Sequence, residues 1–130
     1  MTRILNLQED HDWQKFGIDL PAIQAHCAER GDIEIVRSPL VDFSDDSLRR
    51  NLAVAVAELA RLLEDGHRVY VHCTAGLGRA PAVVIAYMHW MAGCALTCTL
   101  SFSKTECIFV SAARKGATAV FSGYLTSLVT

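Results

Sequence analysis

Apolar positions along the chain follow two spacings, one typical of strands and one typical of helices. Short apolar runs predict strands at Arg3 to Leu7, Ile33 to Val36 and Val69 to His72. Apolar residues that recur every three or four positions predict helices from Ile18 to about Glu29, from Ser44 or Asp45 to about Leu63, and from Ala80 to Trp90. This alternation predicts an α/β fold, with a mostly parallel central sheet flanked by helices.

The 130 residues are expected to form one domain, residues 1–130, whose pattern becomes atypical after about residue 93. Cys94 to Ser103 has neither clean periodicity nor charge. Ser111 to Leu128 is expected to form a terminal helix, although Gly116 and Gly123 interrupt it. The C-terminal region therefore has a weaker pattern than the rest of the chain.

The composition excludes several classes of protein. Hydrophobic residues make up 52 % of the chain and charged residues 20 %, which excludes a disordered chain. A formal net charge of −2 leaves no general basic surface for nucleic acid. Charged residues such as Glu58 and Arg61 interrupt the longest alanine-rich stretch, so no membrane span is expected, and the N-terminus resembles neither a signal peptide nor a transit peptide. No feature of the sequence indicates an oligomeric state.

Five cysteines are an odd number without the spacing of a disulfide framework, which favours a reducing intracellular compartment. The pair Cys94 and Cys98 has no second Cys/His pair at the spacing of a zinc site. We therefore expect no metal and no other cofactor.

The segment from Cys73 to Arg79, here called the signature loop, contains the candidate chemistry. Its five intervening residues are Thr74, Ala75, Gly76, Leu77 and Gly78. A predicted strand precedes the loop and a predicted helix follows it, so backbone N–H groups and the helix N-terminus would attract an anion and favour the thiolate form of Cys73. Arg79 can bind a phosphate in a bidentate manner. The sequence therefore predicts phosphoryl transfer to Cys73.

A cysteine-dependent phosphatase needs a proton donor for the leaving oxygen, and Asp42 is the candidate, since it follows the second strand on a loop. Asp45 and Asp46 are the rivals, but a role in capping the next helix explains them more simply.

The signature loop resembles the His-Cys-x5-Arg motif of the cysteine-dependent phosphatases. More narrowly, Cys73 to Pro81 is similar to the loop of the laforin-like and plant starch-excess-type glucan phosphatases within the dual-specificity branch. The resemblance extends from about Arg3 to Gly93. It implies a protein-tyrosine-phosphatase-like fold, here without the family's first strands, and a metal-independent reaction through a cysteinyl-phosphate. It also implies that Asp42 and Phe43 form the family's acid-plus-aromatic pair, and that His72 has a supporting role, holding the signature loop.

The same resemblance implies that the substrate is a phosphorylated, starch-like polysaccharide and favours a plastid, or otherwise the cytoplasm. Phe16, Phe43 and Trp13 are then the candidates for stacking on sugar rings. Ala80 stands where most dual-specificity phosphatases have a hydroxyl residue, a departure that the plant enzymes share. Two alternatives remain: a phosphatase for phosphoproteins or phosphoinositides, and a phosphate- or glucan-binding module without turnover.

Overall fold

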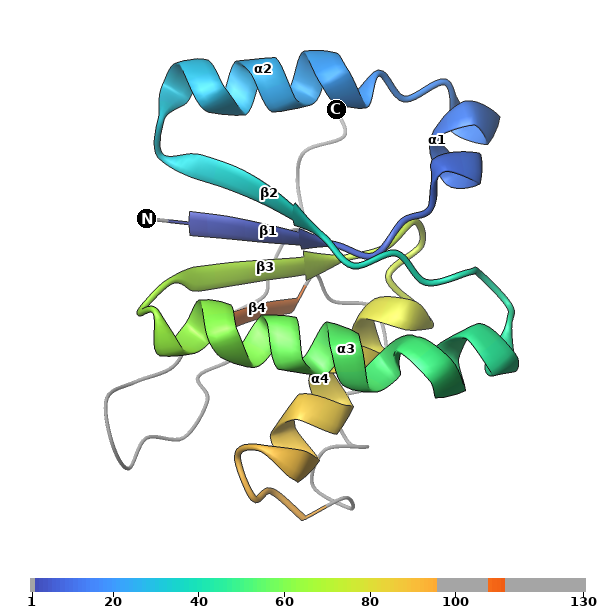
Figure 1. The fold of residues 1–130 in the computed structure, drawn as a ribbon, viewed down its shortest axis with the longest axis vertical. Helices are drawn as coiled ribbons and strands as arrows, with labels where there is room; N and C mark the ends of the chain where they lie inside the picture. The colour runs from blue at the N-terminus through green and yellow to red at the C-terminus, as the bar shows by residue number, and fades with distance from the viewer. Residues whose placement is uncertain (1, 96–107, 112–130) are drawn as a thin grey trace, which may run out of the picture.

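The computed structural model describes residues 2–95 and 108–111 (Figure 1). Along the chain its elements are β1 (Thr2–Asn6), α1 (Asp10–Phe16), α2 (Leu20–Arg30), β2 (Ile33–Arg37), α3 (Asp45–Glu64), β3 (Arg68–His72), α4 (Arg79–Trp90) and β4 (Ile108–Ser111).

The strands form one sheet in the order β2-β1-β3-β4. Strand β1 pairs in parallel with both neighbours, so that Leu5 lies opposite Val36 on one side and Val71 on the other. Strand β4 pairs with β3 in the antiparallel direction. Helix α2 covers one face of the sheet, and α3 and α4 cover the other (Figure 1). The expected α/β fold, with its mostly parallel sheet between helices, is confirmed.

The main hydrophobic core lies between the sheet and the helices α3 and α4. Leu5, Val69 and Val71 point into it from the strands and are almost fully buried. Leu59 of α3 and Val83 of α4 fill it from the helices, and neither exposes any of its surface. By contrast, α2 buries only two residues, at positions 20 and 27.

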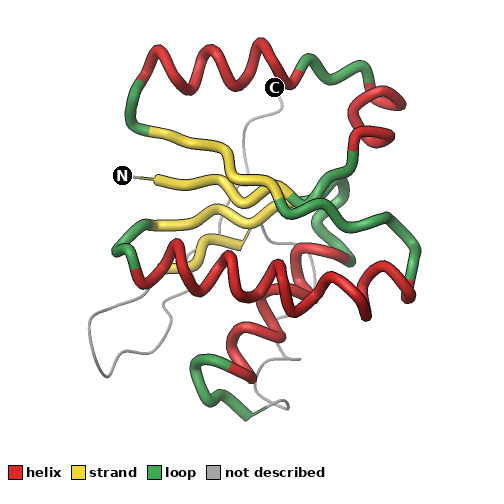
Figure 2. The backbone as a smooth tube through the Cα atoms, in the orientation of Figure 1, coloured by secondary structure: helices red, strands yellow, loops and turns green. Residues whose placement is uncertain are grey.

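The three parallel strands end at the same edge of the sheet, and their loops converge there (Figure 2). The loop after β1 leads into α1, the loop after β2 leads into α3, and the loop after β3 leads into α4. This edge is where ligands bind in open parallel sheets, because the helices that follow present their N-termini to it.

The strands and helices predicted before residue 93 all form, with ends that differ from expectation by one or two residues. Helix α3 begins after Ser44, whose side chain accepts a hydrogen bond from the Ser47 amide and caps the helix. Helix α2 ends at Gly31, which adopts a positive φ of 72° that suits glycine.

Two elements were not expected from the sequence. Helix α1 lies in a stretch for which the sequence predicted no element, because it has seven residues and no apolar periodicity. Glu9 and Asp12 form a capping box at its N-terminus, in which the Asp12 carboxylate accepts a hydrogen bond from the backbone N–H of Glu9. Strand β4 depends on pairing with β3, a contact between segments far apart in the sequence. Ser111 ends β4, and the rest of the expected terminal helix lies outside the described residues.

Among the helices that the structure describes, none combines the length and apolarity that crossing a bilayer requires.

We expect the substitution Leu59→Ala to lower the free energy of unfolding by about 2–5 kcal/mol, because it leaves a cavity in the core between α3 and the sheet. The control is Val54→Ala on the same helix, where the side chain is 63 % exposed and the expected loss is below about 0.5 kcal/mol. Urea denaturation measures both. Equal losses in the two variants would contradict this assignment of the core.

Candidate active site

The signature loop connects β3 directly to α4. Cys73 is the first residue after β3 and Arg79 is the first residue of α4, and both are buried. Gly76 has a φ of 73°, a conformation that strains any residue with a side chain. Gly78 is the N-cap of α4 and offers no side-chain cap, so the first amides of this helix receive no hydrogen bond acceptor from that residue. The loop and helix N-terminus therefore suit an anion.

Arg79 is held by acceptors from three other parts of the chain, although only 4 % of its surface is exposed. Its Nη1 donates to Asp12 Oδ2 at 2.6 Å and to the Leu40 carbonyl at 2.9 Å, and its Nη2 donates to Thr74 Oγ1 at 3.0 Å. The Nε lies 3.3 Å from Asp42 Oδ1, but it is not aligned for a hydrogen bond and is buried without a partner among the described residues. The Nε–H of the guanidinium therefore has no hydrogen bond partner among the described residues and lies beside Asp42.

The ion pair between Asp12 and Arg79 determines the charge of the site. Burial by itself raises the pKa of the Asp12 carboxyl. Hydrogen bonds from Arg79, the Glu9 amide and the Thr74 hydroxyl outweigh burial and bring the pKa below its usual value. Burial disfavours the charged Arg79 guanidinium, but Asp12 raises its pKa above the usual value. Both partners therefore stay ionised, and the guanidinium is fixed in orientation.

His72 is neutral, with its tautomer determined by its neighbours. The backbone N–H of Gln8 donates to Asn6 Oδ1 at 2.9 Å, which identifies that atom as the oxygen of the Asn6 side chain. The Asn6 Nδ2 is therefore the atom that lies 2.9 Å from His72 Nε2. The Nε2 then accepts, and the protonated Nδ1 donates to the Cys73 carbonyl at 3.1 Å. Burial lowers the pKa of His72, and the charge of Arg79 lowers it further, while the bond to Cys73 acts in the opposite direction. The expected supporting role remains a prediction that this geometry favours.

Gln8 and Asp12 are two site residues that the sequence analysis did not find. Gln8 Nε2 donates to Thr74 Oγ1 at 3.0 Å, and Trp13 Nε1 donates to Gln8 Oε1 at 3.2 Å. Thr74 Oγ1 thus accepts hydrogen bonds from both Gln8 and Arg79. A signal was present, because the residues that follow β1 must lie at the same edge of the sheet as the signature loop.

Residues 40–44, here called the acid loop, form most of the connection between β2 and α3. They face the signature loop across a pocket of about 310 Å³. The pocket is lined by Val41, Asp42, Phe43, Ser44, Asp45, Leu48, Cys73, Ala75, Leu77, Gly78 and Arg79. Hydrogen bonding at the start of α3 fixes the loop, since the Val41 amide donates to Ser47 Oγ at 3.0 Å. The structure therefore brings together Cys73, Arg79 and Asp42 in one pocket.

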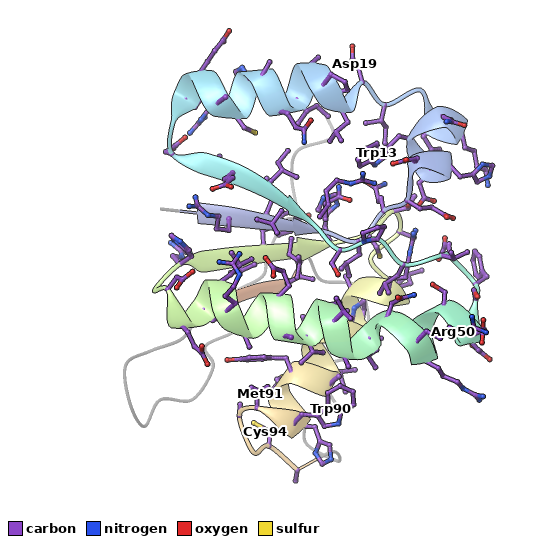
Figure 3. All side chains as sticks on the ribbon, viewed as in Figure 1. Trp13, Asp19, Arg50, Trp90, Met91 and Cys94 are labelled. Atoms are coloured by element: carbon purple, nitrogen blue, oxygen red, sulfur yellow. The ribbon has the colours of Figure 1, made fainter. Side chains whose placement is uncertain are left out.

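Phe43 is the strained residue of the acid loop. Its φ of 54° lies in the left-handed region, which is unusual for an aromatic residue, and its side chain is fully exposed at the pocket. Of the two rival acids, Asp45 also lines this pocket, whereas Asp46 forms an ion pair with Arg50 on the exposed surface of α3 (Figure 3).

The other two candidate aromatic residues do not line the pocket. Phe16, at the end of α1, is half-exposed, with Lys15 Nζ 5.4 Å from its ring centroid. Trp13 is buried, and the Arg37 guanidinium lies 3.9 Å from its ring centroid (Figure 3). Because Trp13 is buried and Arg37 lies over its ring, this geometry does not favour stacking of Trp13 on glucan.

The cysteines within the described residues, Cys27, Cys73 and Cys94, are all free thiols. In the same part of the chain, no three His, Cys, Asp or Glu side chains gather as ligands of a metal. Cys98, the second member of the cysteine pair considered above, lies outside the described residues.

Residues 1–110 match the family model of the dual specificity phosphatase catalytic domain. The chain is 39 % identical over 102 residues to the phosphoglucan phosphatase LSF1, chloroplastic, of Arabidopsis thaliana, covering 78 % of this chain and 17 % of that protein. It is 37 % identical over 131 residues to the phosphoglucan phosphatase DSP4, amyloplastic, of Castanea sativa, covering 98 % of this chain and 35 % of that protein. Laforin of Mus musculus is 46 % identical over 55 residues, which cover 42 % of this chain and 17 % of laforin.

A similar solved structure is the crystal structure of Tk-PTP in the active form, with a TM-score of 0.58 and 26 % identity, covering 77 % of this chain and 62 % of that one. The chain thus spans between about a sixth and about a third of the length of the three curated relatives.

The half-buried, neutral His72 makes the stability of the fold depend on pH. Because its pKa in the folded state lies below the ordinary value of 6.5, the unfolded chain binds a proton that the folded chain does not as the pH falls below about 6.5. The free energy of unfolding therefore decreases from pH 7.5 to pH 5.5, by up to about 1.4 kcal/mol per pH unit below 6.5.

Urea denaturation at pH 7.5 and pH 5.5 should show a smaller loss of stability in the variant His72→Gln than in the parent. The control His26→Gln, at an exposed position, should retain the full loss. Identical pH dependence in His72→Gln and the parent would contradict this role of His72.

Proposed function

The chain belongs to the dual-specificity phosphatase family, and on that premise we propose that it removes phosphate from a phosphorylated glucan through a cysteinyl-phosphate. The family expected from the signature loop is confirmed. The observation that carries the proposal is the common pocket of Cys73, Arg79 and Asp42, where the buried Arg79 Nε has no hydrogen bond partner among the described residues.

In the first step, the Cys73 thiolate attacks phosphorus, and the S–P bond forms as the P–O bond to the sugar breaks. Asp42, protonated at this stage, gives its proton to the leaving oxygen. The N-terminus of α4 and the Arg79 guanidinium stabilise the charge on the phosphoryl oxygens. Both are already oriented towards the pocket in the absence of substrate, so no reorganisation is needed during the reaction.

In the second step, Asp42 is a carboxylate and takes a proton from a water molecule, which attacks phosphorus. The S–P bond breaks, inorganic phosphate forms, and Cys73 leaves as a thiolate. Ala80 is buried and supplies no hydroxyl to the leaving sulfur, so we expect this step to be slower than in relatives with a serine there.

The rim of the pocket favours a sugar chain as the substrate. Two exposed apolar side chains, Phe43 of the acid loop and Leu77 of the signature loop, line the pocket together with Cys73. An aromatic side chain stacks on the apolar face of a sugar ring, and an aliphatic side chain packs against it. The signature loop contains no lysine, which argues against a highly charged phosphoinositide headgroup. Two relatives bear the name phosphoglucan phosphatase, and their names, chloroplastic and amyloplastic, support a plastid location for this chain.

We expect Cys73→Ser to abolish phosphate release from an aryl phosphate, measured with EDTA present, because the hydroxyl is a much poorer nucleophile than the thiolate. Asp42→Asn should lower kcat by about 10²- to 10⁴-fold, since the amide cannot donate the proton. The control Asp46→Asn, in an exposed ion pair on α3, should retain activity. Full activity in Cys73→Ser would contradict the mechanism. No release by a folded parent would leave a phosphate- or glucan-binding module.

A second variant tests the substrate. Phe43→Ala should lower kcat/KM for solubilised phosphoglucan by about three- to tenfold, the loss of one aromatic stacking contact, and leave hydrolysis of the small aryl phosphate nearly unchanged. The control Trp90→Ala removes a half-exposed aromatic ring at the far end of α4 and should leave both activities unchanged (Figure 3). A parent that prefers a phosphotyrosine peptide to phosphoglucan would move the substrate to proteins.

A further inference from the structure

We propose that Arg37, outside the pocket of Cys73, is a positioning residue for the phosphate site. It holds residues 8–13, which follow β1, in the place from which Gln8 and Asp12 orient the signature loop. The inference deepens the proposed function and rests on it, because it concerns the same site.

The residues that orient the signature loop come from a segment with little support of its own. Backbone hydrogen bonds to the neighbouring segments end at Leu7, and the helix that follows, α1, has only seven residues. Isolated helices of this length are not stable in water, so contacts from elsewhere must keep the segment in place. A shift of 1 Å in such a segment would misalign Arg79, because its shortest hydrogen bond is made to Asp12.

Arg37, the last residue of β2, contacts this segment at three points. Its Nη2 donates to the Gln8 carbonyl at 3.2 Å and to Asp10 Oδ1 at 2.8 Å. Its guanidinium carbon lies 3.9 Å from the centroid of the Trp13 ring, a cation–π contact with a buried partner. These three contacts lie on both sides of Asp12 in the chain.

The contact with Trp13 also reaches the signature loop. The Trp13 Nε1 donates to Gln8 Oε1, and the other end of the same amide donates to Thr74 Oγ1. Arg37 therefore supports both routes to the phosphate site, the route through Gln8 and the route through Asp12. A lysine cannot replace it, because an ammonium group has no flat face to stack on the ring and cannot reproduce the planar geometry.

The test is a double-mutant cycle with aryl phosphate as the substrate. Arg37→Lys keeps the charge beside Asp10, and we expect a decrease in kcat/KM of about tenfold with the fold intact by thermal denaturation. In the background of Asp12→Asn the same substitution should lower kcat/KM by clearly less than about tenfold, because the route through Asp12 is already lost and only the route through Gln8 remains. The matched control is Arg30→Lys, in the exposed pair with Asp32, which should change nothing.

An equal decrease in both backgrounds, or no decrease in a folded Arg37→Lys protein, would overturn the proposal. If Arg37→Lys fails to fold, Asp10→Asn tests the same contact from the exposed side and should lower kcat/KM by about two- to threefold; unchanged activity there would also overturn it.

Binding of inorganic phosphate to the Cys73→Ser protein separates this proposal from the proposed function, because binding needs no turnover. Calorimetry should show weaker phosphate binding when Arg37→Lys is added to Cys73→Ser. A parent that hydrolyses nothing would end the proposed function and leave this comparison valid. Equal phosphate binding with and without Arg37→Lys would overturn the role of Arg37 alone.

Discussion

The guanidinium of Arg79 carries a full charge at a position where 4 % of the residue is exposed, and the rest of the site is arranged around this charge. A buried charge is costly unless it is paired and hydrogen-bonded. The partners come from three segments: Asp12 from α1, the Leu40 carbonyl from the acid loop and Thr74 from the signature loop. Compensating one charge therefore brings together the three loops at the edge of the sheet.

The fold makes this convergence possible because the three parallel strands end at one edge, with β1 in the middle. The arrangement leaves the Arg79 Nε without a hydrogen bond partner among the described residues, 3.3 Å from Asp42 Oδ1 and next to the uncapped N-terminus of α4. Phe43 keeps a strained backbone beside the same carboxylate. Unsatisfied donors and local backbone strain are unfavourable for folding, and they are typical of ligand-binding and catalytic sites.

The parts of this picture with a local cause could be predicted from the sequence. The 20-residue helix α3 shows its apolar spacing and its Ser44 cap directly, and the signature loop shows its chemistry in seven consecutive residues. The parts that depend on long-range contacts could not. Asp12 looks like one more acidic residue in a polar stretch until β1 and β3 pair and bring it to Arg79. From the sequence, Trp13 is a candidate for stacking on sugar rings, because nothing in the sequence shows that the Arg37 guanidinium lies over its ring.

The most direct test of the account is to trap the intermediate. We would mix the Asp42→Asn protein with an aryl phosphate that has a good leaving group, quench with acid, and identify the modified peptide by mass spectrometry. The account predicts one added phosphoryl group on Cys73, because the first step then needs little help from the acid while the second step lacks its base. A protein that turns over the aryl phosphate with no phosphoryl group on Cys73, or with the group on another residue, would contradict it.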